Sequence, residues 1–144
     1  MGVERPAAVL EIIDGQLATS RYLAPLDAYD GAVLFFETSE ELPSATYVYR
    51  VLMRMGERGL LQRFSAVLVG RPKCWALEEP RDAITKRRYA QDQRAAVLSA
   101  VGEYHPNAVV VFNLDLGHTD PQYVMPHGGT VRVDATAYRI TVVY

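Results

Sequence analysis

The sequence predicts one α/β domain, residues 1–144, with a mixed sheet that has a parallel β-α-β-α-β part followed by antiparallel C-terminal strands. Three apolar runs, 31–36, 65–69 and 108–112, alternate with two helical segments, an order typical of parallel strands joined by right-handed crossovers. Beyond residue 122 the chain changes to short strands separated by turns, which favours antiparallel pairing at one edge of the sheet.

The first part of the chain contains one clear strand. Residues 7–13 are apolar and fit either a short helix or a strand, and Asp14-Gly15 is typical of a turn. Residues 20–30 have the character of a surface loop. The run 31–36 is apolar throughout and too short for a helix, so it predicts a buried strand that ends on Glu37.

Two helices and the remaining strands follow. Pro43-Ser44 begins a helix that ends at Gly56 or Gly59, because apolar residues recur at helical spacing and glycine favours a helix end. Residues 83–104 are rich in Arg, Ala, Gln and Leu, which favour a second helix. A loop over 71–83 connects it to the preceding strand. The C-terminal strands are expected at 123–125, 130–133 and 138–143.

Composition excludes several classes of protein. Hydrophobic residues make up 49% and charged residues 22% of the chain, an ordinary balance for a globular domain. The net charge of −2 gives no basis for binding nucleic acid or an anionic membrane, and no apolar run approaches the ~20 residues of a transmembrane helix. Cys74 is the only cysteine and residues 1–6 contain no signal-peptide pattern, so we expect a cytoplasmic protein.

The most informative stretch, residues 112–121, places His118 just after a buried strand. Ligand sites in open α/β sheets lie outside the carboxyl ends of strands, and histidine exchanges protons near neutral pH. Glu37 has the equivalent position after the strand 31–36. If the two side chains meet, the carboxylate fixes the imidazole tautomer and leaves the other nitrogen free to act as a base. The pair would form two members of a hydrolytic triad.

The third member, the nucleophile, is absent by sequence criteria. No Gly-x-Ser-x-Gly elbow occurs, and no serine lies in a strand-to-helix turn flanked by glycines. Cys74 lies in a Pro-rich loop with no fixed place relative to His118. We therefore expect the nucleophile on another domain that this chain lacks. The excluded serines are Ser20, Ser39, Ser44, Ser65 and Ser99.

Other interpretations of these residues are open. A histidine after a strand is often structural, and a glutamate there is often solvated or caps the next helix. Asp115, His118 and Asp120 are suitable types of metal ligand, although their spacing matches no zinc motif. We expect Lys86-Arg87-Arg88 to be a solvated helix face and Trp75 to pack within its loop.

Three segments occur in an order that matches a known family. The first is Gly31-Ala-Val-Leu-Phe-Phe-Glu37-Thr-Ser-Glu-Glu, and the second is Ser65-Ala-Val-Leu-Val-Gly70-Arg71. The third is Leu114-Asp-Leu-Gly-His118-Thr-Asp-Pro121, followed by Met125-Pro-His-Gly-Gly129. Together they resemble the C-terminal domain of the LD-carboxypeptidase and microcin-immunity family of serine peptidases (peptidase family S66).

The resemblance implies a swivelling β/β/α-like domain that supplies Glu37 and His118 as catalytic residues to a serine on an N-terminal domain. The reaction would be hydrolysis of an amide bond next to a free carboxyl end, without metal or organic cofactor. The substrate would be a murein tetrapeptide, in peptidoglycan recycling, or a peptidyl-nucleotide such as a peptidyl-adenylate, in microcin immunity. Substrate-binding residues stay unassigned, and the isolated chain is expected to be inactive.

The sequence departs from the family pattern at three points. The serine domain is absent, and Arg5-Pro6-Ala7-Ala8 stands where a Gly-Gly pair is expected. In addition, 81 positions separate Glu37 from His118, which is longer than typical for the family.

Two further expectations concern partners. A hypothesis from another class is a non-enzymatic carrier or interaction module that holds a phosphoryl group on His118. Because the partner domain is missing, we also expect a homo-oligomer formed through the surface beside Glu37, His118 and the loop 71–83.

Overall fold

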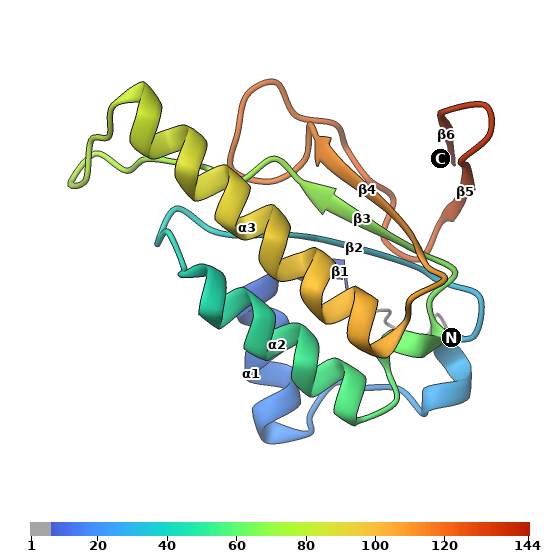
Figure 1. Cartoon of the computed structure of the whole chain (residues 1–144). Coiled ribbons are helices and arrows are strands. Elements are labelled where there is room, and N and C mark those ends of the chain that lie inside the picture. Colours follow the sequence, from blue (N-terminus) through green and yellow to red (C-terminus); the bar gives the residue numbers. More distant parts are fainter. Residues whose placement is uncertain (1–6) are drawn as a thin grey trace.

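The chain forms a four-stranded parallel sheet with helices on one face and a separate two-stranded hairpin (Figure 1). The structure is a computed structural model that describes residues 7–144, so Arg5 and Pro6, at the expected Gly-Gly position, lie outside the described residues. The strands are β1 (Ala7–Val9), β2 (Val33–Glu37), β3 (Ala66–Gly70), β4 (Val109–Leu114), β5 (Thr130–Asp134) and β6 (Arg139–Val143). The helices are α1 (Leu10–Thr19), α2 (Ala45–Glu57) and α3 (Ala83–Tyr104), with short 3-10 turns η1 (Leu26–Tyr29) and η2 (Leu61–Arg63).

The main sheet has the strand order β1-β2-β3-β4, and every neighbouring pair is parallel. The parallel arrangement predicted for the three central apolar runs is therefore confirmed, with β1 added at the edge. Because each right-handed crossover moves the chain one strand in the same direction, all three helices lie on the same face of the sheet (Figure 1). The carboxyl ends of β2, β3 and β4 consequently lie together at one end of the sheet.

The hydrophobic core lies between this face and the helices. Leu34 and Phe36 of β2 and Val67 of β3 are almost fully buried there. Gly56 lets α2 and α3 approach closely, because a Cβ at this position would clash with the ring of Tyr104. The helices contribute mainly Val48, Val51, Leu52 and Met55 from α2, and Ala96, Val97, Ala100 and Val101 from α3.

Helix α3 has the predicted bounds, and α2 begins at the predicted cap: the Ser44 hydroxyl accepts a hydrogen bond from the N–H of Tyr47 at 3.1 Å. The turn predicted at Asp14-Gly15 is wrong, because both residues lie inside α1. Asp14 accepts a hydrogen bond from the Tyr47 hydroxyl at 3.0 Å and pairs with Arg54. These contacts with α2 favour the continued helix over a turn.

The C-terminal strands pair with each other and do not extend the main sheet. The strand predicted at 123–125 does not form; this segment lies between Pro121 and Pro126, which lack the N–H groups that a strand needs. Alternate residues of the hairpin, including Ile140 and Val142, are half-buried and line a cavity with Leu68 of β3. The hairpin therefore lies over the second face of the sheet, and cavities lined by Val33, Phe35 and Leu68 separate the two.

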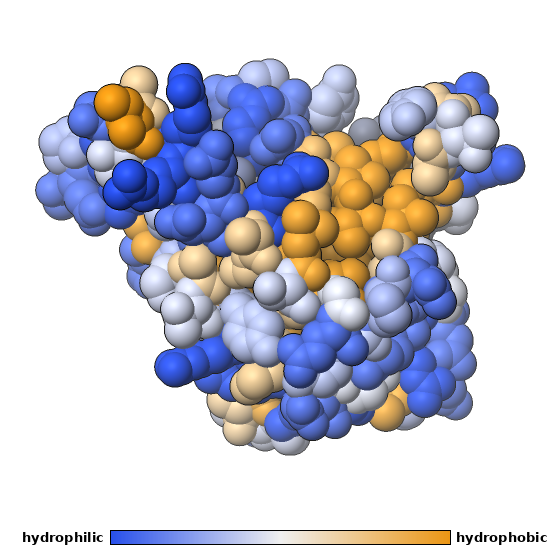
Figure 2. Space-filling view, viewed as in Figure 1, coloured by the Kyte–Doolittle hydropathy of each residue, from blue (hydrophilic) through white to orange (hydrophobic). Residues whose placement is uncertain are grey.

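The surface differs between the two ends of α3. Figure 2 shows apolar side chains gathered over β4, between α3 and the hairpin, whereas the surface around the start of α3 is mostly hydrophilic. None of the helices within residues 7–144 combines the length and the apolar character that crossing a membrane requires.

Candidate active site

Glu37 and His118 are in contact at the carboxyl end of the sheet. Nδ1 of His118 lies 2.8 Å from Oε2 and 3.0 Å from Oε1 of Glu37, and the backbone N–H of His118 donates to Oε2 at 3.2 Å. The Glu37 side chain is only 8% exposed, while that of His118 is 34% exposed. The approach expected from the sequence is therefore confirmed, and one edge of the imidazole faces outward from a buried carboxylate.

The two residues meet across β3, which separates β2 from β4. Their strands are not direct neighbours, so the contact depends on Gly70 at the end of β3. A Cβ at Gly70 would lie 2.7 Å from Cβ of Glu37, 2.7 Å from Cδ1 of Leu116 and 2.8 Å from the Leu116 carbonyl oxygen. The missing side chain leaves the space in which the Glu37 and His118 segments come together.

An irregularity in β4 directs its carboxyl end toward Glu37. The pairing of β3 with β4 shifts register between Leu68 and Gly70, and Asn113 in β4 adopts a φ of 60°. Such bulges bend a strand and turn its side chains in a new direction. Further along, Gly117 has a φ of 97°, and a Cβ there would clash with the Glu37 carboxylate. Gly117 is therefore required both by its backbone conformation and by the closeness of Glu37.

Contact with Glu37 increases the proton affinity of His118. The hydrogen bond that Nδ1–H of His118 donates to Glu37 raises the pKa of His118 above its ordinary value of 6.5. Burial opposes this rise, the charges of Glu37 and Glu40 add to it, and the charge of Lys73 lowers the pKa. When the ring is neutral, a carboxylate on Nδ1 favours the tautomer with its proton on Nδ1. Nε2 then carries a lone pair and can act as a general base.

A second carboxylate, Glu40, faces Nε2 of His118. Its Oε2 lies 2.8 Å from Nε2, and its side chain is 55% exposed. A backbone hydrogen bond and the charge of His118 lower the pKa of Glu40. Glu40 was not among the site residues expected from the sequence, although its position three residues after Glu37 in the Glu-Thr-Ser-Glu-Glu segment was a usable signal.

The loop that carries Glu40 is fixed by α1. Oε1 of Glu11 accepts hydrogen bonds from the N–H of Ser39 at 3.1 Å and from its hydroxyl at 2.6 Å. The Ser39 oxygen in turn accepts from the N–H of Glu41 at 3.2 Å. Glu40 is thus held between two anchored residues, while its exposed side chain can rotate into solvent.

No serine or cysteine within the described residues 7–144 is hydrogen-bonded to His118, whose side-chain partners there are Glu37 and Glu40. Ser65 donates to the carbonyl of Gly31 at 3.0 Å, at the opposite end of β2. The Cys74 thiol donates to the Pro72 carbonyl at 3.3 Å, and burial raises the pKa of this thiol. A raised pKa disfavours the thiolate that a cysteine nucleophile needs.

Asp115, His118 and Asp120 do not form a metal centre. Asp115 pairs with Arg71. In the part of the chain that the structure describes, no group of three or more His, Cys, Asp or Glu side chains is arranged to hold a metal ion.

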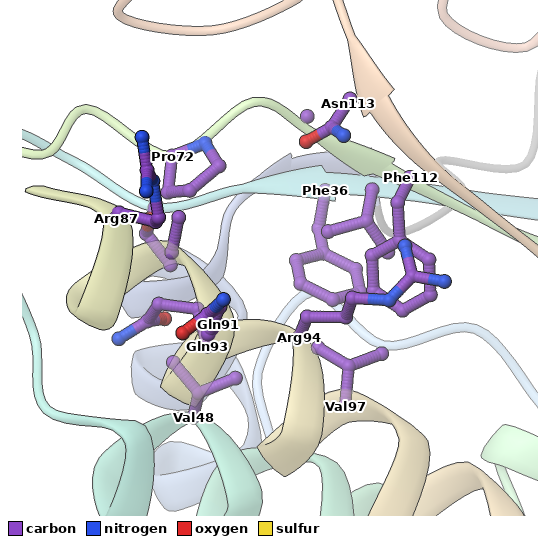
Figure 3. A pocket seen from close by; sticks show the side chains of 14 residues that line it. Phe36, Val48, Pro72, Arg87, Gln91, Gln93, Arg94, Val97, Phe112 and Asn113 are labelled. Atoms are coloured by element: carbon purple, nitrogen blue, oxygen red, sulfur yellow. The ribbon is translucent and has the colours of Figure 1, made fainter.

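A cavity of about 190 Å³ lies between α3 and the core side of the sheet, below the strand ends that carry the site. Figure 3 shows Phe36 and Phe112 in its wall, with the Arg94 guanidinium over Phe112, 4.3 Å from the ring centroid. Thr38 and Gly70 also line the cavity. Neither Glu37 nor His118 faces it, so the cavity borders the site without containing its polar groups.

Residues 8–133 match the family described as the LD-carboxypeptidase C-terminal domain. The chain belongs to this family. The match covers the segments that carry Glu37 and His118, so the family resemblance found in the sequence is confirmed for this LD-carboxypeptidase C-terminal domain.

Two solved structures are similar to this domain. An MccF-like protein from Streptococcus pneumoniae, in complex with AMP, is 25% identical with a TM-score of 0.74, and the match covers 96% of this chain and 39% of that protein. A muramoyltetrapeptide carboxypeptidase from Oxalobacter formigenes is 20% identical with a TM-score of 0.67, and the match covers 94% and 42%. This chain therefore spans about two fifths of the length of either protein. No curated protein matches it.

Proposed function

We propose that this LD-carboxypeptidase C-terminal domain supplies the glutamate and histidine of a Ser-Glu-His carboxypeptidase, and that the serine is carried by a separate N-terminal domain. The observation that carries the proposal is the buried Glu37 carboxylate, which contacts Nδ1 of His118 through both of its oxygens. Membership of the family and the greater length of the two similar structures support it.

In the proposed reaction, Nε2 of His118 takes the proton of the serine hydroxyl while the serine oxygen bonds to the amide carbon. The imidazolium, stabilised by Glu37, then gives this proton to the leaving amine as the C–N bond breaks. Water, deprotonated by the same nitrogen, hydrolyses the acyl-serine and releases a carboxylic acid and the free serine. Because every step uses Nε2, Glu40 must move away when the serine approaches.

The proposed substrate is an amide next to a free carboxyl end, in a murein tetrapeptide or a peptidyl-adenylate. One of the similar structures is named for the first kind of substrate and the other contains AMP. We place this activity in the cytoplasm, in peptidoglycan recycling or in resistance to microcin-type compounds; a chain with Cys74 as its only cysteine is suited to a reducing compartment.

The charges at the site favour this hypothesis over a phosphohistidine carrier. A phosphoryl donor is anionic and would meet the carboxylates of Glu37 and Glu40 beside the two ring nitrogens. A serine hydroxyl is neutral and meets no such repulsion. We expect intact mass measurement after incubation with a phosphodonor to show no added phosphoryl group.

Activity measurements test the proposal directly. The 144-residue chain alone is expected to show no hydrolysis of either substrate, because it has a base without a nucleophile. A polypeptide that carries a serine domain ahead of this one should be active, and His118→Ala should lower its kcat by about 10⁶-fold. His127→Ala is the matched control, because His127 is exposed and lies outside the site.

Two results would contradict the proposal. Turnover by the chain alone that disappears in His118→Ala would show that the nucleophile lies within these residues. Full activity of the longer polypeptide with His118→Ala would show that this histidine is not catalytic.

A further inference from the structure

The chain contains only two lysines and one tryptophan, although it has thirteen arginines. The structure brings these three residues together beside the candidate active site. Nζ of Lys73 lies 5.3 Å from the centroid of the Trp75 ring, and Nζ of Lys86 lies 5.6 Å from it. Both distances are within the range of a cation–π interaction, so one indole restrains two otherwise flexible ammonium groups.

The segment around these lysines is basic within an acidic chain. Residues 71–88 contain six basic and three acidic residues, a net charge of +3, whereas the whole chain has a net charge of −2. Glu79 pairs with Arg81, and Asp82 caps α3 through the N–H of Thr85. Neither lysine forms an ion pair within the described residues, so their charges are available to a ligand. The basic residues are Arg71, Lys73, Arg81, Lys86, Arg87 and Arg88.

Lys73 connects this cluster to the candidate active site. It lies three residues beyond Gly70, and its charge lowers the pKa of both Glu40 and His118. Because three residues span at most roughly 11 Å, the Lys73 backbone lies close to Gly70, the residue above which the Glu37 and His118 segments meet. Trp75 is 40% exposed, and the surface around the start of α3 is hydrophilic and open to solvent (Figure 2).

We propose that Lys73 and Lys86, held on Trp75, form a binding site for the anionic group of the substrate, next to the bond that His118 helps to cleave. This inference rests on the proposed carboxypeptidase function and adds a subsite to it. An ammonium is a compact point charge with three donors, and it binds carboxylate and phosphate oxygens alike. The ligand group is the free carboxylate of a peptide or the phosphate of a peptidyl-nucleotide.

Binding to the 144-residue chain can be measured without a serine domain. Reductive ¹³C-methylation labels only the two lysines and the N-terminus, so each lysine gives its own NMR signal, and fluorescence of the single tryptophan reports on the same place. The probes are AMP and adenosine, and a peptide ending in D-alanine and its C-terminal amide. We expect AMP or the free peptide to shift both lysine signals saturably, and less so at high salt, whereas adenosine and the amide do not.

Variants separate this site from general charge attraction. The double variant Lys73→Gln and Lys86→Gln should weaken binding about tenfold, since two partly exposed charge contacts are removed. Arg132→Gln with Arg139→Gln is the control, because it removes the same charge from exposed positions of the hairpin and should bind normally. Trp75→Leu should also weaken binding although it keeps both lysines, because the ammonium groups are no longer restrained.

The result that would overturn the inference is equally direct. If no anionic probe shifts either lysine signal, or if the double lysine variant binds with unchanged affinity, the lysines only cover the indole with their aliphatic chains. This outcome is independent of the proposed hydrolysis. The proposed catalytic role of His118 is contradicted by a different result, namely full activity of the longer polypeptide with His118→Ala. That measurement involves neither lysine.

Discussion

Replacing Gly70 with alanine tests whether the end of β3 must lack a side chain for the site to form. The added Cβ would lie 2.7 Å from carbon atoms of Glu37 and Leu116, and 2.8 Å from the Leu116 carbonyl oxygen. Carbon atoms normally approach to ~3.5–4 Å. The carbonyl belongs to the backbone and cannot rotate away alone, so the segment leading to His118 has to shift.

The expected cost follows from this overlap. Overpacking of this kind costs about 1–3 kcal/mol, which corresponds to a decrease in Tm of roughly 3–10 °C for a domain of this size. Urea denaturation measures the change in the free energy of unfolding. NMR titration measures the pKa of His118, which should fall toward 6.5 as its hydrogen bond to Glu37 weakens.

Two glycines of the same chain serve as controls. An added Cβ at Gly15 in α1 or Gly102 in α3 would meet no atom within 4 Å. Alanine at these helical positions should therefore raise the free energy of unfolding by about 0.4–1 kcal/mol. If Gly70→Ala keeps the wild-type stability and leaves the titration of His118 unchanged, the reasoning about the space above β3 is wrong.

The remaining predictions concern protonation and association. Glu37→Gln should lower the pKa of His118 toward 6.5, measured by NMR, and Glu40→Gln should lower it less, because the Glu40 side chain is exposed. Because folding raises the pKa of His118, this residue stabilises the folded state below pH 6.5. The stabilisation is lost as the pH rises through the pKa of His118 in the folded state. The contribution of His118 to the free energy of unfolding should be smaller in Glu37→Gln. Sedimentation at several concentrations should detect a dimer or larger oligomer formed through the surface beside Glu37, His118 and the loop 71–83, and a strictly monomeric protein at millimolar concentration would count against it.

The strands and helices that support the site could be predicted because their signals are local. The run 31–36 is apolar throughout and too short for a helix, so it predicts a strand that is buried on both faces of a sheet. Asp82 and Ser44 each provide a side-chain oxygen for the first turn of a helix. Predictions were wrong where distant contacts decided the outcome, as in Asp14-Gly15, which α2 holds in a helix.

The site itself was predictable only in part. Glu37 and His118 could be identified because Glu37 ends one apolar strand and His118 closely follows another, and their neighbours resemble a family pattern. Glu40 was missed because its one local signal, the position three residues after Glu37, does not by itself separate a site residue from a solvated loop glutamate. The charge coupling of Lys73 to Glu40 and His118 was missed for the same reason.

The sequence by itself determined the alternation of the three central strands with α2 and α3, the parallel character of the main sheet and the two residues that end β2 and follow β4. Apolar periodicity, capping residues and crossover handedness act over a few residues or one connection, so their effects can be predicted from the sequence alone. Only the tertiary structure decided that Glu37 and His118 meet across an intervening strand, and that the two lysines converge on Trp75. The first arrangement depends on the strand order and on the space above Gly70, and the second depends on the position of α3 beside the indole. Neither forms until the sheet and α3 have packed together.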